Sequence, residues 1–576
     1  MKRFIFYIII IFNADFISAQ KLFPKDYAFR SIIADSTDSL LSSTNTMRSN
    51  VVTEIILQSD NLVWLGTGLG ISIVRDSLTV ETLQDTMELT NGAYTNRIPS
   101  GGISAMTTGD PGGPYEKFMF AAAAGSENDI PIGKGIVFTT DATDSTINWI
   151  YYDQPMDDAL SDTIPFGDIG FIAVLPVTVP QANVTYDMDL SEEFAWTASW
   201  AGGLRRFKFS DQVWERVPLP MDNQYELTTC KDTSYVRVGG KYILKDYYLN
   251  PRDPLDGGNH NHKAFSVLSY GDTIWVGTAN GINRGILGSG NCIDWEHYSY
   301  PMDNLSGNFV VGLEAQRLNG KRIIWAATVN ADDPTEQRGL SYTIDDGLSW
   351  NTALLGERIY NIASFDSLVF AASANGLWKT EDGINWALYN PAHQAIPVPN
   401  TAIYDIDEVL ADEVYSVAFD DRPYYGDRSI WIGTGDGAAH SYDLDGLNWK
   451  IFRAEYDINE DYAYPNPFSP YTHNVRNDNG YVRFHTNEWP GTFVIDIDIY
   501  NFAMEKVYAG SFDKRISSSG ALKWDGRDQQ GVYVHNGVYF VKLTYPENQS
   551  SKPSPHWVKL IAVSYTHLTL PTILLV

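Results

Sequence analysis

The sequence predicts an all-β chain: a seven-bladed β-propeller followed by a small Ig-like β-sandwich. Three observations lead to this fold class. The composition is that of a globular protein, with 44% hydrophobic and 13% aromatic residues. The 16 Trp, 34 Tyr and 46 Gly favour many short strands joined by turns. A short pattern also recurs, which lets 576 residues fold without one oversized core.

The recurring pattern is an aliphatic pair, an aromatic residue, one or more small residues and a Gly further on. Its copies lie roughly 45 to 80 residues apart, a spacing that suits four-stranded propeller blades. We expect the aromatic residues to pack between neighbouring blades. In the seven copies they are Trp64, Phe120, Trp196, Trp275, Trp325, Phe370 and Trp431.

Each copy is flanked by further predicted strands. An alternating strand precedes it, over residues 52–60, 102–110, 170–177, 264–272, 309–316, 361–367 and 414–421. A fourth strand often carries a Trp, as at Trp149, Trp214, Trp295, Trp350, Trp386 and Trp449. Small residues follow the aromatic because inner strands converge on the axis, where only short side chains fit. These residues are Gly66, Gly277, Ala326, Ala371 and Gly433.

One copy, DTIWVGTANGINRG over residues 272–285, could alternatively be a strand followed by a phosphate-binding loop. Such a loop carries a Gly-Lys-Ser/Thr sequence and opens a helix. This segment has neither feature, and its pattern recurs elsewhere in the chain. We therefore interpret it as two strands of one blade.

The segment TIDDGLSW matches a known turn pattern through Thr343, Asp345, Gly347 and Trp350. A carboxylate at this position closes a hairpin by accepting hydrogen bonds from turn amides, and the Trp packs as a wedge. KTEDGINW, with Glu381, Gly383 and Trp386, is a degenerate copy. These segments resemble the Asp boxes of sialidases and related propellers, and the Trp-x-Gly-Thr phrasing is similar to the sensor propellers of two-component regulators. The resemblance implies a fold and no chemistry.

The propeller repeat ends near residue 462, where a Pro-rich segment and a different set of predicted strands begin. We expect a propeller over residues 20–455, a Pro-rich linker over 456–470 and an Ig-like sandwich over 471–563. Read alone, the segment around Trp524 is a turn that places the Trp inside the sandwich and pairs an Asp with an Arg. It consists of Trp524, Asp525, Gly526, Arg527 and Asp528.

Together with residues 464–468, 499–501 and 537–539, that segment resembles the Ig-like domain of the flagellar hook-capping type. This domain serves as the C-terminal sorting domain of type IX secretion cargo. The resemblance covers the whole domain. It implies export across two membranes, the type IX machinery as a partner, and then release or surface attachment.

The two ends of the chain carry other signals. Residues 1–19 are expected to be a signal peptide, because Lys2 and Arg3 precede a short apolar run with a cleavage site after Ala19. No second long apolar stretch follows, so we expect the mature chain to be an exported monomer with no membrane span. The last segment, VSYTHLTLPT, resembles a translated sequencing adapter. We therefore expect residues 564–576 to be non-native.

The net charge of −30 argues against a nucleic-acid partner. It favours a solvated acidic surface, or weak Ca²⁺ binding at carboxylate loops; no other cofactor is expected. Cys230 and Cys292 are the two cysteines of the chain, too few for a disulfide framework or a Cys₄ zinc site. Two interpretations stay open for them: one bridge in an exported protein, or two packed thiols.

Propeller ligands usually meet the axial funnel, at the loops that enter the innermost strands. We expect the polar residues of these loops to converge there and to suit a polar or anionic ligand such as a sugar acid. They are Arg97, Asp168, His260, His262, Asn308, Arg358, Tyr360 and Tyr415. His260 and His262 on a strand would point to one face as a metal edge, although backbone hydrogen bonding at a strand entrance is the favoured interpretation.

No catalytic set emerges from the sequence. The tripeptide at Arg97 resembles the arginine motif of sialidases, with Asp168 as an acid/base and Tyr360 or Tyr415 as a nucleophile. However, no Glu/Tyr nucleophile pair can be placed. We therefore expect a secreted or cell-surface binding protein for a polysaccharide, a surface component or a protein. A sialidase-like glycoside hydrolase is the alternative.

Overall fold

The structure, a computed structural model, describes residue 47 and residues 49–563 apart from 59–60, 76–78, 84–88, 129, 145–146, 332, 390–391, 398–403, 423–427, 454–460, 472, 475–479, 486–493, 514–521 and 546–554. The expected signal peptide and the expected non-native tail lie outside these residues. The described chain is all-β: it contains no α-helix, and its helical turns are the 3₁₀ segments η2 (Asp232–Ser234), η3 (Pro254–Asp256), η4 (His260–His262) and η5 (Ser289–Asn291). None of its helical segments is long and apolar enough to cross a membrane.

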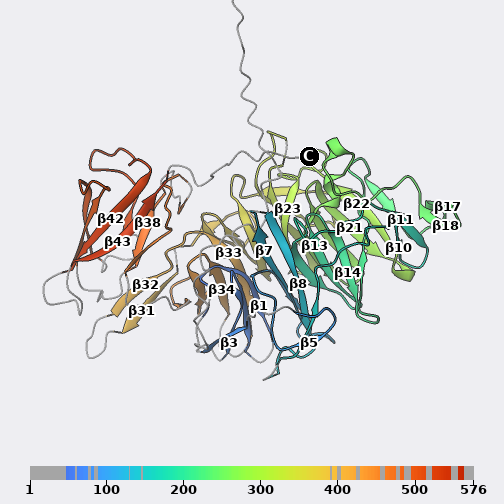
Figure 1. Ribbon diagram of the computed structural model, residues 1–576, viewed down its shortest axis with the longest axis horizontal. Helices are drawn as coiled ribbons and strands as arrows, with labels where there is room; N and C mark the ends of the chain where they lie inside the picture. Colours follow the sequence, from blue (N-terminus) through green and yellow to red (C-terminus); the bar gives the residue numbers. More distant parts are fainter. Residues whose placement is uncertain are drawn as a thin grey trace, which may run out of the picture.

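Most strands belong to sheets of four or five antiparallel strands, which we call blades 1 to 7 in chain order (Figure 1). Blade 1 contains β1 (Val52–Leu57), β2 (Val63–Thr67), β3 (Gly70–Arg75) and β4 (Thr79–Leu83). Blade 2 contains β6 (Gly102–Thr108), β7 (Met119–Glu127), β8 (Ile130–Thr139), β9 (Trp149–Tyr152) and β5 (Tyr94–Thr95). Blade 3 contains β12 (Thr185–Leu190), β13 (Phe194–Ser199), β14 (Gly203–Lys208) and β15 (Val213–Arg216). Blade 4 is β19 (Ala264–Tyr270), β20 (Thr273–Thr278), β21 (Gly281–Leu287), β22 (Ile293–Tyr298) and β16 (Glu226–Thr228).

Blade 5 contains β23 (Phe309–Leu318), β24 (Lys321–Val329), β25 (Gly339–Thr343) and β26 (Asn351–Ala353). Blade 6 contains β27 (Ile359–Phe365), β28 (Leu368–Ser373), β29 (Gly376–Thr380) and β30 (Ala387–Leu388). Blade 7 contains β33 (Val414–Asp420), β34 (Ser429–Thr434), β35 (Gly437–Ser441) and β36 (Trp449–Phe452). The hairpin of β31 (His393–Pro397) and β32 (Tyr404–Glu408) comes between blades 6 and 7 in the chain and touches β36.

The blades form a closed ring. The first strand of each blade contacts the first strand of the next, and β33 of blade 7 contacts β1 of blade 1. This closure makes the fold a β-propeller, as the sequence predicts. The described residues hold seven such sheets, which equals the number of repeats in the sequence.

Close approach of the blades explains the small residues after each aromatic. A Cβ on Gly277 would lie 2.5 Å from the carbonyl oxygen of Val310 in the next blade, and one on Gly433 would lie 2.6 Å from that of Val52. A larger residue at either position would push the neighbouring first strand outward. The expected steric role of these glycines is therefore confirmed.

The recurring Trp residues pack between blades. In three places a Trp of a second strand meets the Trp at the fourth strand of the next blade edge to face, with ring centroids 5.9 to 6.0 Å apart. The pairs are Trp64 with Trp149, Trp275 with Trp350, and Trp325 with Trp386. One sequence repeat thus supplies both halves of the contact that joins successive blades.

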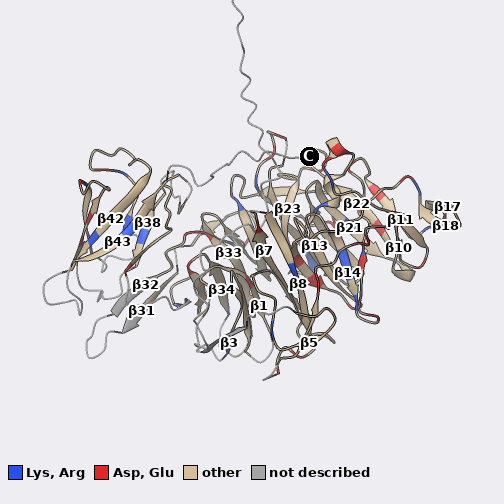
Figure 2. Ribbon diagram, viewed as in Figure 1, with Lys and Arg blue, Asp and Glu red and all other residues tan. Residues whose placement is uncertain are grey.

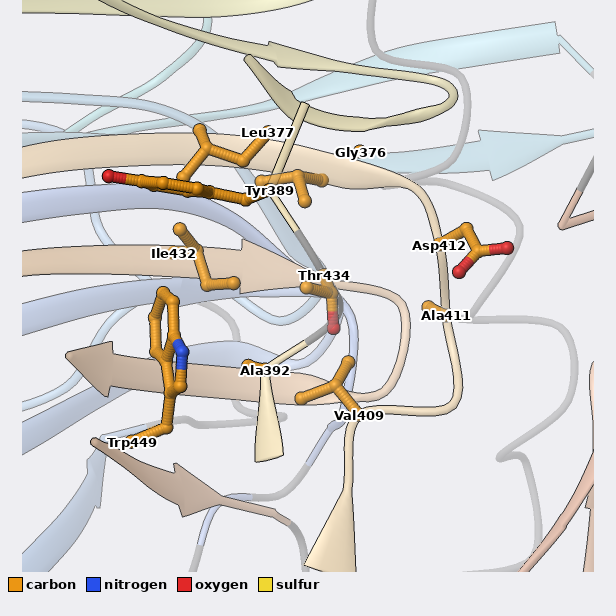
Figure 3. Close-up of a pocket in the computed structure, with 11 residues that line it drawn as sticks. Gly376, Leu377, Tyr389, Ala392, Val409, Ala411, Asp412, Ile432, Thr434 and Trp449 are labelled. Carbon is orange, nitrogen blue, oxygen red and sulfur yellow. The ribbon is translucent and has the colours of Figure 1, made fainter. Parts of the chain in front are cut away.

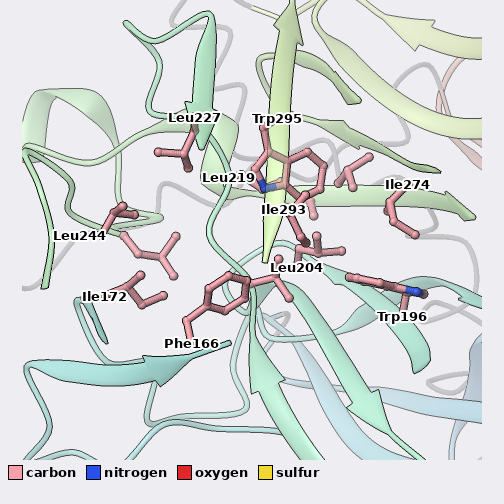
Figure 4. Packing of buried hydrophobic residues seen from close by; sticks show 14 of the residues in the cluster. Phe166, Ile172, Trp196, Leu204, Leu219, Leu227, Leu244, Ile274, Ile293 and Trp295 are labelled. Carbon is pink, nitrogen blue, oxygen red and sulfur yellow. The ribbon is translucent and has the colours of Figure 1, made fainter. Parts of the chain in front are cut away.

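One predicted strand is wrong. Residues 170–177 do not open blade 3, because its first strand is β12. Their described strand, β11 (Gly170–Ala173), belongs to a side sheet with β10 (Thr163–Phe166), β17 (Tyr235–Val238) and β18 (Lys241–Leu244). One face of the side sheet packs on blades 3 and 4 through Phe166, Ile172 and Leu244 (Figure 4). The segment is apolar because it covers these blades, so its pattern mimics that of an inner strand.

Cys230 and Cys292 form a disulfide across 62 residues of sequence. Cys230 follows β16 and Cys292 directly precedes β22. The bridge therefore ties the segment that leads to the side sheet to blade 4. Of the two interpretations left open by the sequence, the structure contains the bridge.

The C-terminal domain consists of two sheets. One contains β37 (Tyr462–Tyr464), β38 (Val482–His485) and β41 (Lys523–Trp524), and the other has the order β40 (Lys506–Asp513), β39 (Val494–Tyr500), β42 (Gly537–Thr544) and β43 (His556–Ala562). Because β37 pairs with β38, part of the expected linker over 456–470 is already a strand of the sandwich. The two sheets enclose a common apolar core.

The turn that follows β41 has the predicted form. Trp524 is 2% exposed, and its indole nitrogen donates to the carbonyl oxygen of Arg527 at 2.8 Å. Asp525 accepts a hydrogen bond from the backbone of Arg527 and lies 3.9 Å from its guanidinium. The Asp528 carboxylate accepts from the amides of Gln530 and Val532. Gly526 has a φ of 77°, which favours Gly at this position.

The Asp-box segment also closes its hairpin through a carboxylate. Asp345 accepts hydrogen bonds from the backbone and the hydroxyl of Ser349 and from the hydroxyl of Thr343. In the degenerate copy, Asp382 takes this part, in place of the expected Glu381, by accepting from two turn amides. Asp443 does the same in blade 7, where the sequence pattern is lengthened and was not identified.

Candidate functional site

A β-bulge lies near the start of the first strand of every blade. The register of each first strand slips by one residue against the second strand, which leaves one residue unpaired per blade. We call the end of the ring where these bulges lie the mouth. The bulge residues are Thr53, Ser104, Tyr186, Phe265, Val311, Tyr360 and Tyr415. Bulges re-aim side chains and often lie beside functional sites.

Aromatic bulge residues gather at the mouth. Phe265 lies next to Tyr186, Trp200 and Phe309, with ring centroids 6.2, 5.3 and 5.5 Å away. The Lys263 ammonium lies 4.7 Å from the Trp200 ring. Tyr186, Phe265 and Phe309 are buried, so blades 3 to 5 contribute an aromatic wall that packs inside the ring, with the buried Lys263 at its edge.

Blades 6 and 7 supply a second, more polar group. The rings of Tyr360 and Tyr415 meet edge to face at 5.5 Å, and the Arg358 guanidinium lies 5.3 Å from the Tyr360 ring. The Tyr415 hydroxyl donates to the Glu413 carboxylate at 2.8 Å. Burial and the negative charge of Glu413 raise the pKa of Tyr415 well above its usual value. Arg358, Tyr360 and Tyr415 are thus brought together as expected, and Glu413 joins them.

The C-terminal domain reaches this group. The Tyr464 hydroxyl lies 2.1 Å, and the Tyr415 hydroxyl 3.5 Å, from the point where a Cβ on Gly435 would sit. Gly435 is therefore required for Tyr464 to approach, because any side chain there would clash with it. The mouth at blade 7 is consequently shared between the two domains.

His262 is a structural residue. It is fully buried, its Nδ1 lies 3.0 Å from the backbone nitrogen of Asn250, and its Nε2 lies 3.0 Å from the carbonyl oxygen of Leu219. Burial lowers its pKa to about 3, so the ring is neutral at ordinary pH. The metal-edge geometry is wrong, since His260 and His262 form the 3₁₀ turn η4 and not a strand. The favoured interpretation, backbone hydrogen bonding at a strand entrance, is confirmed for His262.

Asn308 is likewise engaged in loop contacts. Its backbone nitrogen donates to the Glu336 carboxylate at 3.0 Å, and its side-chain oxygen accepts from the backbone of Tyr300 at 2.8 Å. These bonds hold the loop that enters blade 5. Asn308 therefore has a structural role in the loop at the mouth.

Arg97 and Asp168 do not join the blade 6 and 7 group. Arg97 is exposed at the start of blade 2, and blades 1 and 7 separate it from Arg358. Asp168 lies in the turn between β10 and β11, where its amide donates to the carbonyl oxygen of Gly290 at 3.2 Å. Gly290 is in the turn between the third and fourth strands of blade 4, at the end of the ring opposite the mouth. The placement of Asp168 in the funnel is wrong because the strand after it is not an inner strand.

Two hollows differ from the mouth in position and lining. A cavity of about 20 Å³ lies between blades 6 and 7 and has a mainly apolar lining that includes Leu377, Ile432 and Trp449 (Figure 3). It holds about one water molecule. A groove of about 460 Å³ lies on the opposite face between blades 3 and 4, and its charged lining residues are Glu192, Glu193 and Asp272.

Metal-ligating side chains do not cluster in the described part of the chain. No group of three or more His, Cys, Asp or Glu residues there is placed to hold an ion. The carboxylates of the acidic turns, Asp345, Asp382 and Asp443, accept hydrogen bonds from backbone amides instead. A Ca²⁺ site thus has no residues to assign it to in this part of the molecule.

No family profile and no curated protein matches the chain. Similar solved structures include PorZ, a surface component of the type IX secretion system of Porphyromonas gingivalis, at 12% identity and a TM-score of 0.31. The alignment covers 89% of this chain and 65% of PorZ, so this chain spans less than two thirds of PorZ.

Two more of the similar structures serve as examples. The extracellular domain of the putative one-component system BT4673 from B. thetaiotaomicron has 12% identity, a TM-score of 0.28 and coverage of 89% and 70% of the two chains. YCF48 from Cyanidioschyzon merolae has 13% identity, a TM-score of 0.35 and coverage of 69% and 96%. Similarity at this level transfers no function, and the propeller fold rests on the sheet order and the closed ring.

Sequence reasoning missed Glu413 and the aromatic wall. Glu413 stands two residues before Tyr415, and Tyr186 and Phe265 occupy the same place in their blades as Tyr360 does. The available signal was an aromatic residue at the second position of the first strand in blades 3, 4, 6 and 7. It was overlooked at Tyr186 because the first strand of blade 3 was misplaced.

Proposed function

We propose that this chain is a secreted or outer-surface binding protein without catalytic activity, whose propeller holds its ligand at the mouth. The ligand class is a polysaccharide, a surface component or a protein. The observation that carries the proposal is the convergence of Arg358, Tyr360, Tyr415 and Glu413 at blades 6 and 7. Arg358 and Glu413 are the partly exposed members of this group, and a guanidinium suits an acidic ligand.

A screen of immobilised acidic and neutral glycans with the full chain tests this proposal. We expect an acidic glycan to bind, and Arg358→Gln to weaken it roughly tenfold because a charge-assisted hydrogen bond is lost. Asp168→Asn, on the opposite face, is the matched control and should bind as the parent does. Equal binding by the parent and Arg358→Gln would place the ligand elsewhere.

We also propose that the C-terminal sandwich directs export by type IX secretion. Its resemblance to sorting domains supports this, and the Cys230–Cys292 disulfide fits an oxidising compartment. In a host with this pathway, the chain truncated after residue 455 should remain in the periplasm while the full chain leaves the cell. Export of both forms would show that the sandwich is not the signal.

One contact favours the hydrolase alternative. A Tyr hydroxyl bonded to a Glu carboxylate, as in Tyr415 and Glu413, is the pair that the sequence failed to supply for a sialidase-like mechanism. However, the pKa of Tyr415 is raised, whereas a nucleophile is activated by a lowered pKa. We expect no release of fluorophore from sialosides or other glycosides. Turnover that disappears in Tyr415→Phe would establish the hydrolase instead.

A further inference from the structure

The outer face of the sandwich sheet β40–β39–β42–β43 has an unusual composition. Residues alternate along its strands, and the inward set, including Ile497, Val541 and Leu560, is buried in the core. The outward set on β39, β42 and β43 includes aromatic, aliphatic and basic side chains, and β39 adds Asp496 and Asp498, the second of which is the register partner of Lys542 and pairs with Lys506. Its members used below are Tyr500, Phe540, Lys542, Trp557, Lys559 and Ile561.

The aromatic side chains of this face lie side by side. The Tyr500 and Trp557 rings have centroids 5.8 Å apart, and Trp557 is 48% exposed. Phe540 lies directly opposite Tyr500 on the neighbouring strand, and Phe502, at the end of the sheet, is 6.4 Å from Phe540. The solvent face of an antiparallel sheet is normally polar, so exposed rings here indicate a surface that is used for contact.

Lysines alternate with the rings. Lys542 is the register partner of Trp557, and Phe540 is the register partner of Lys559. Neither β42 nor β43 contains an Asp or Glu, although the whole chain carries a net charge of −30. Figure 2 shows basic residues on these strands. An anionic partner repelled by the rest of the molecule would therefore meet its complement on the β42–β43 half of this face.

Among the described residues, the propeller contacts the other side of the domain. Arg483 of β38 pairs with Asp412, and Asn474 bonds to the backbone of Leu410. Both residues belong to the part of the sandwich built on the β37–β38–β41 sheet. In Figure 1, β42 and β43 lie on the far side of the domain from the blades.

We propose that the β42–β43 half of this face binds an acidic polysaccharide. The rings of Trp557 and Phe540 stack on the apolar faces of successive sugars, and Lys542 and Lys559 donate charge-assisted hydrogen bonds to the acid groups. A lipid surface would demand side chains that insert beyond the headgroups, whereas Phe540 is half-buried. This site is separate from the mouth of the propeller and does not depend on it.

Affinity electrophoresis of the full chain tests this site. The gels contain polygalacturonate, neutral dextran or neither. We expect polygalacturonate to retard the protein and dextran to leave its mobility unchanged. The double variant Lys542→Gln/Lys559→Gln should weaken retardation by at least roughly tenfold, because two charge-assisted bonds are lost. Trp557→Ala should weaken it as well while the net charge stays the same.

A control variant and a fallback variant make the outcome decisive. Lys241→Gln removes one basic residue from the side sheet and should leave retardation unchanged. Lys559→Gln alone tests the site if the double variant does not fold. Absence of retardation by polygalacturonate, equal retardation of the parent and the face variants, or binding to phosphatidylglycerol vesicles without binding to the polymer would each overturn the proposal.

Discussion

At the scale of single residues, two carboxylates bridge neighbouring first strands in the same way. Asp189 accepts hydrogen bonds from the backbone and the hydroxyl of Ser269 in the next blade, and Glu314 does so from Ser364. Each is the register partner of a recurring Trp, Trp196 for Asp189 and Trp325 for Glu314. Burial raises the pKa of both carboxyl groups to about 7.

These two groups predict a pH dependence. Their folded pKa lies above the unfolded value of about 4, so between these values the folded chain holds protons that the unfolded chain has released. Their contribution to the free energy of unfolding is therefore full below about pH 4 and is lost as the pH rises to about 7. Urea unfolding at pH 5 and pH 8 should show a smaller decline in Asp189→Asn and Glu314→Gln than in the parent. An identical decline in all three proteins would contradict this assignment.

At the scale of elements, the Trp wedge between blades is the main packing device. Trp350 is 5% exposed and meets Trp275 and Tyr298 of the preceding blade. Trp350→Ala should lower the free energy of unfolding by about 3–5 kcal/mol, because a large cavity opens between two blades. Ile344→Ala in the same turn is the control, since Ile344 is 48% exposed and should change stability little. A loss for Trp350→Ala no larger than that for the control would contradict the wedge.

The sequence predicts the blades well because one packing solution recurs. The Trp pair recurs at three blade junctions, and Gly277 and Gly433 both meet a carbonyl oxygen of the next first strand, so a local pattern reports a tertiary contact. The prediction fails for the first strand of blade 3, because this strand, β12, contains Asp187 and Asp189 and therefore has a polar sequence. These acids are tolerated there because the backbone amides of Val267 and Ser269 in the next blade satisfy them, which no local pattern reveals.

The candidate site was predictable only in part. Tyr360 and Tyr415 could be placed from their position at a strand start, whereas the buried state of His262 depends on Asn250 and Leu219, which precede it by 12 and 43 residues. Asp168 was misplaced for the same reason as the strand after it. Contacts between segments without a repeat leave no mark in a single sequence.

At the scale of the whole molecule, a small polar cluster joins propeller and sandwich. The Arg483 guanidinium pairs with the Asp412 carboxylate at 2.5 Å and donates to the carbonyl oxygen of Val409 at 3.1 Å, and both charged side chains are buried. The Asn474 side chain bonds to the backbone of Leu410 and Asp412. The two domains are therefore docked on each other.

Breaking this cluster should separate the domains. Arg483→Met leaves the Asp412 charge buried without its partner, a change that typically costs about 3–5 kcal/mol. Small-angle scattering should show a larger radius of gyration for Arg483→Met than for the parent, and no change for the control Lys523→Met in the neighbouring strand. An unchanged radius for Arg483→Met, with the variant folded, would mean that other contacts hold the domains.

The central claim is that the mouth of the propeller is the binding site. Hydrogen–deuterium exchange of the full chain, with and without the glycan identified by the screen, tests it most directly. We predict slower exchange on binding in residues 357–362 and 413–416, the segments that carry Arg358, Tyr360, Glu413 and Tyr415. Slower exchange confined to the groove between blades 3 and 4 or to the sandwich, with these two segments unchanged, would contradict the claim.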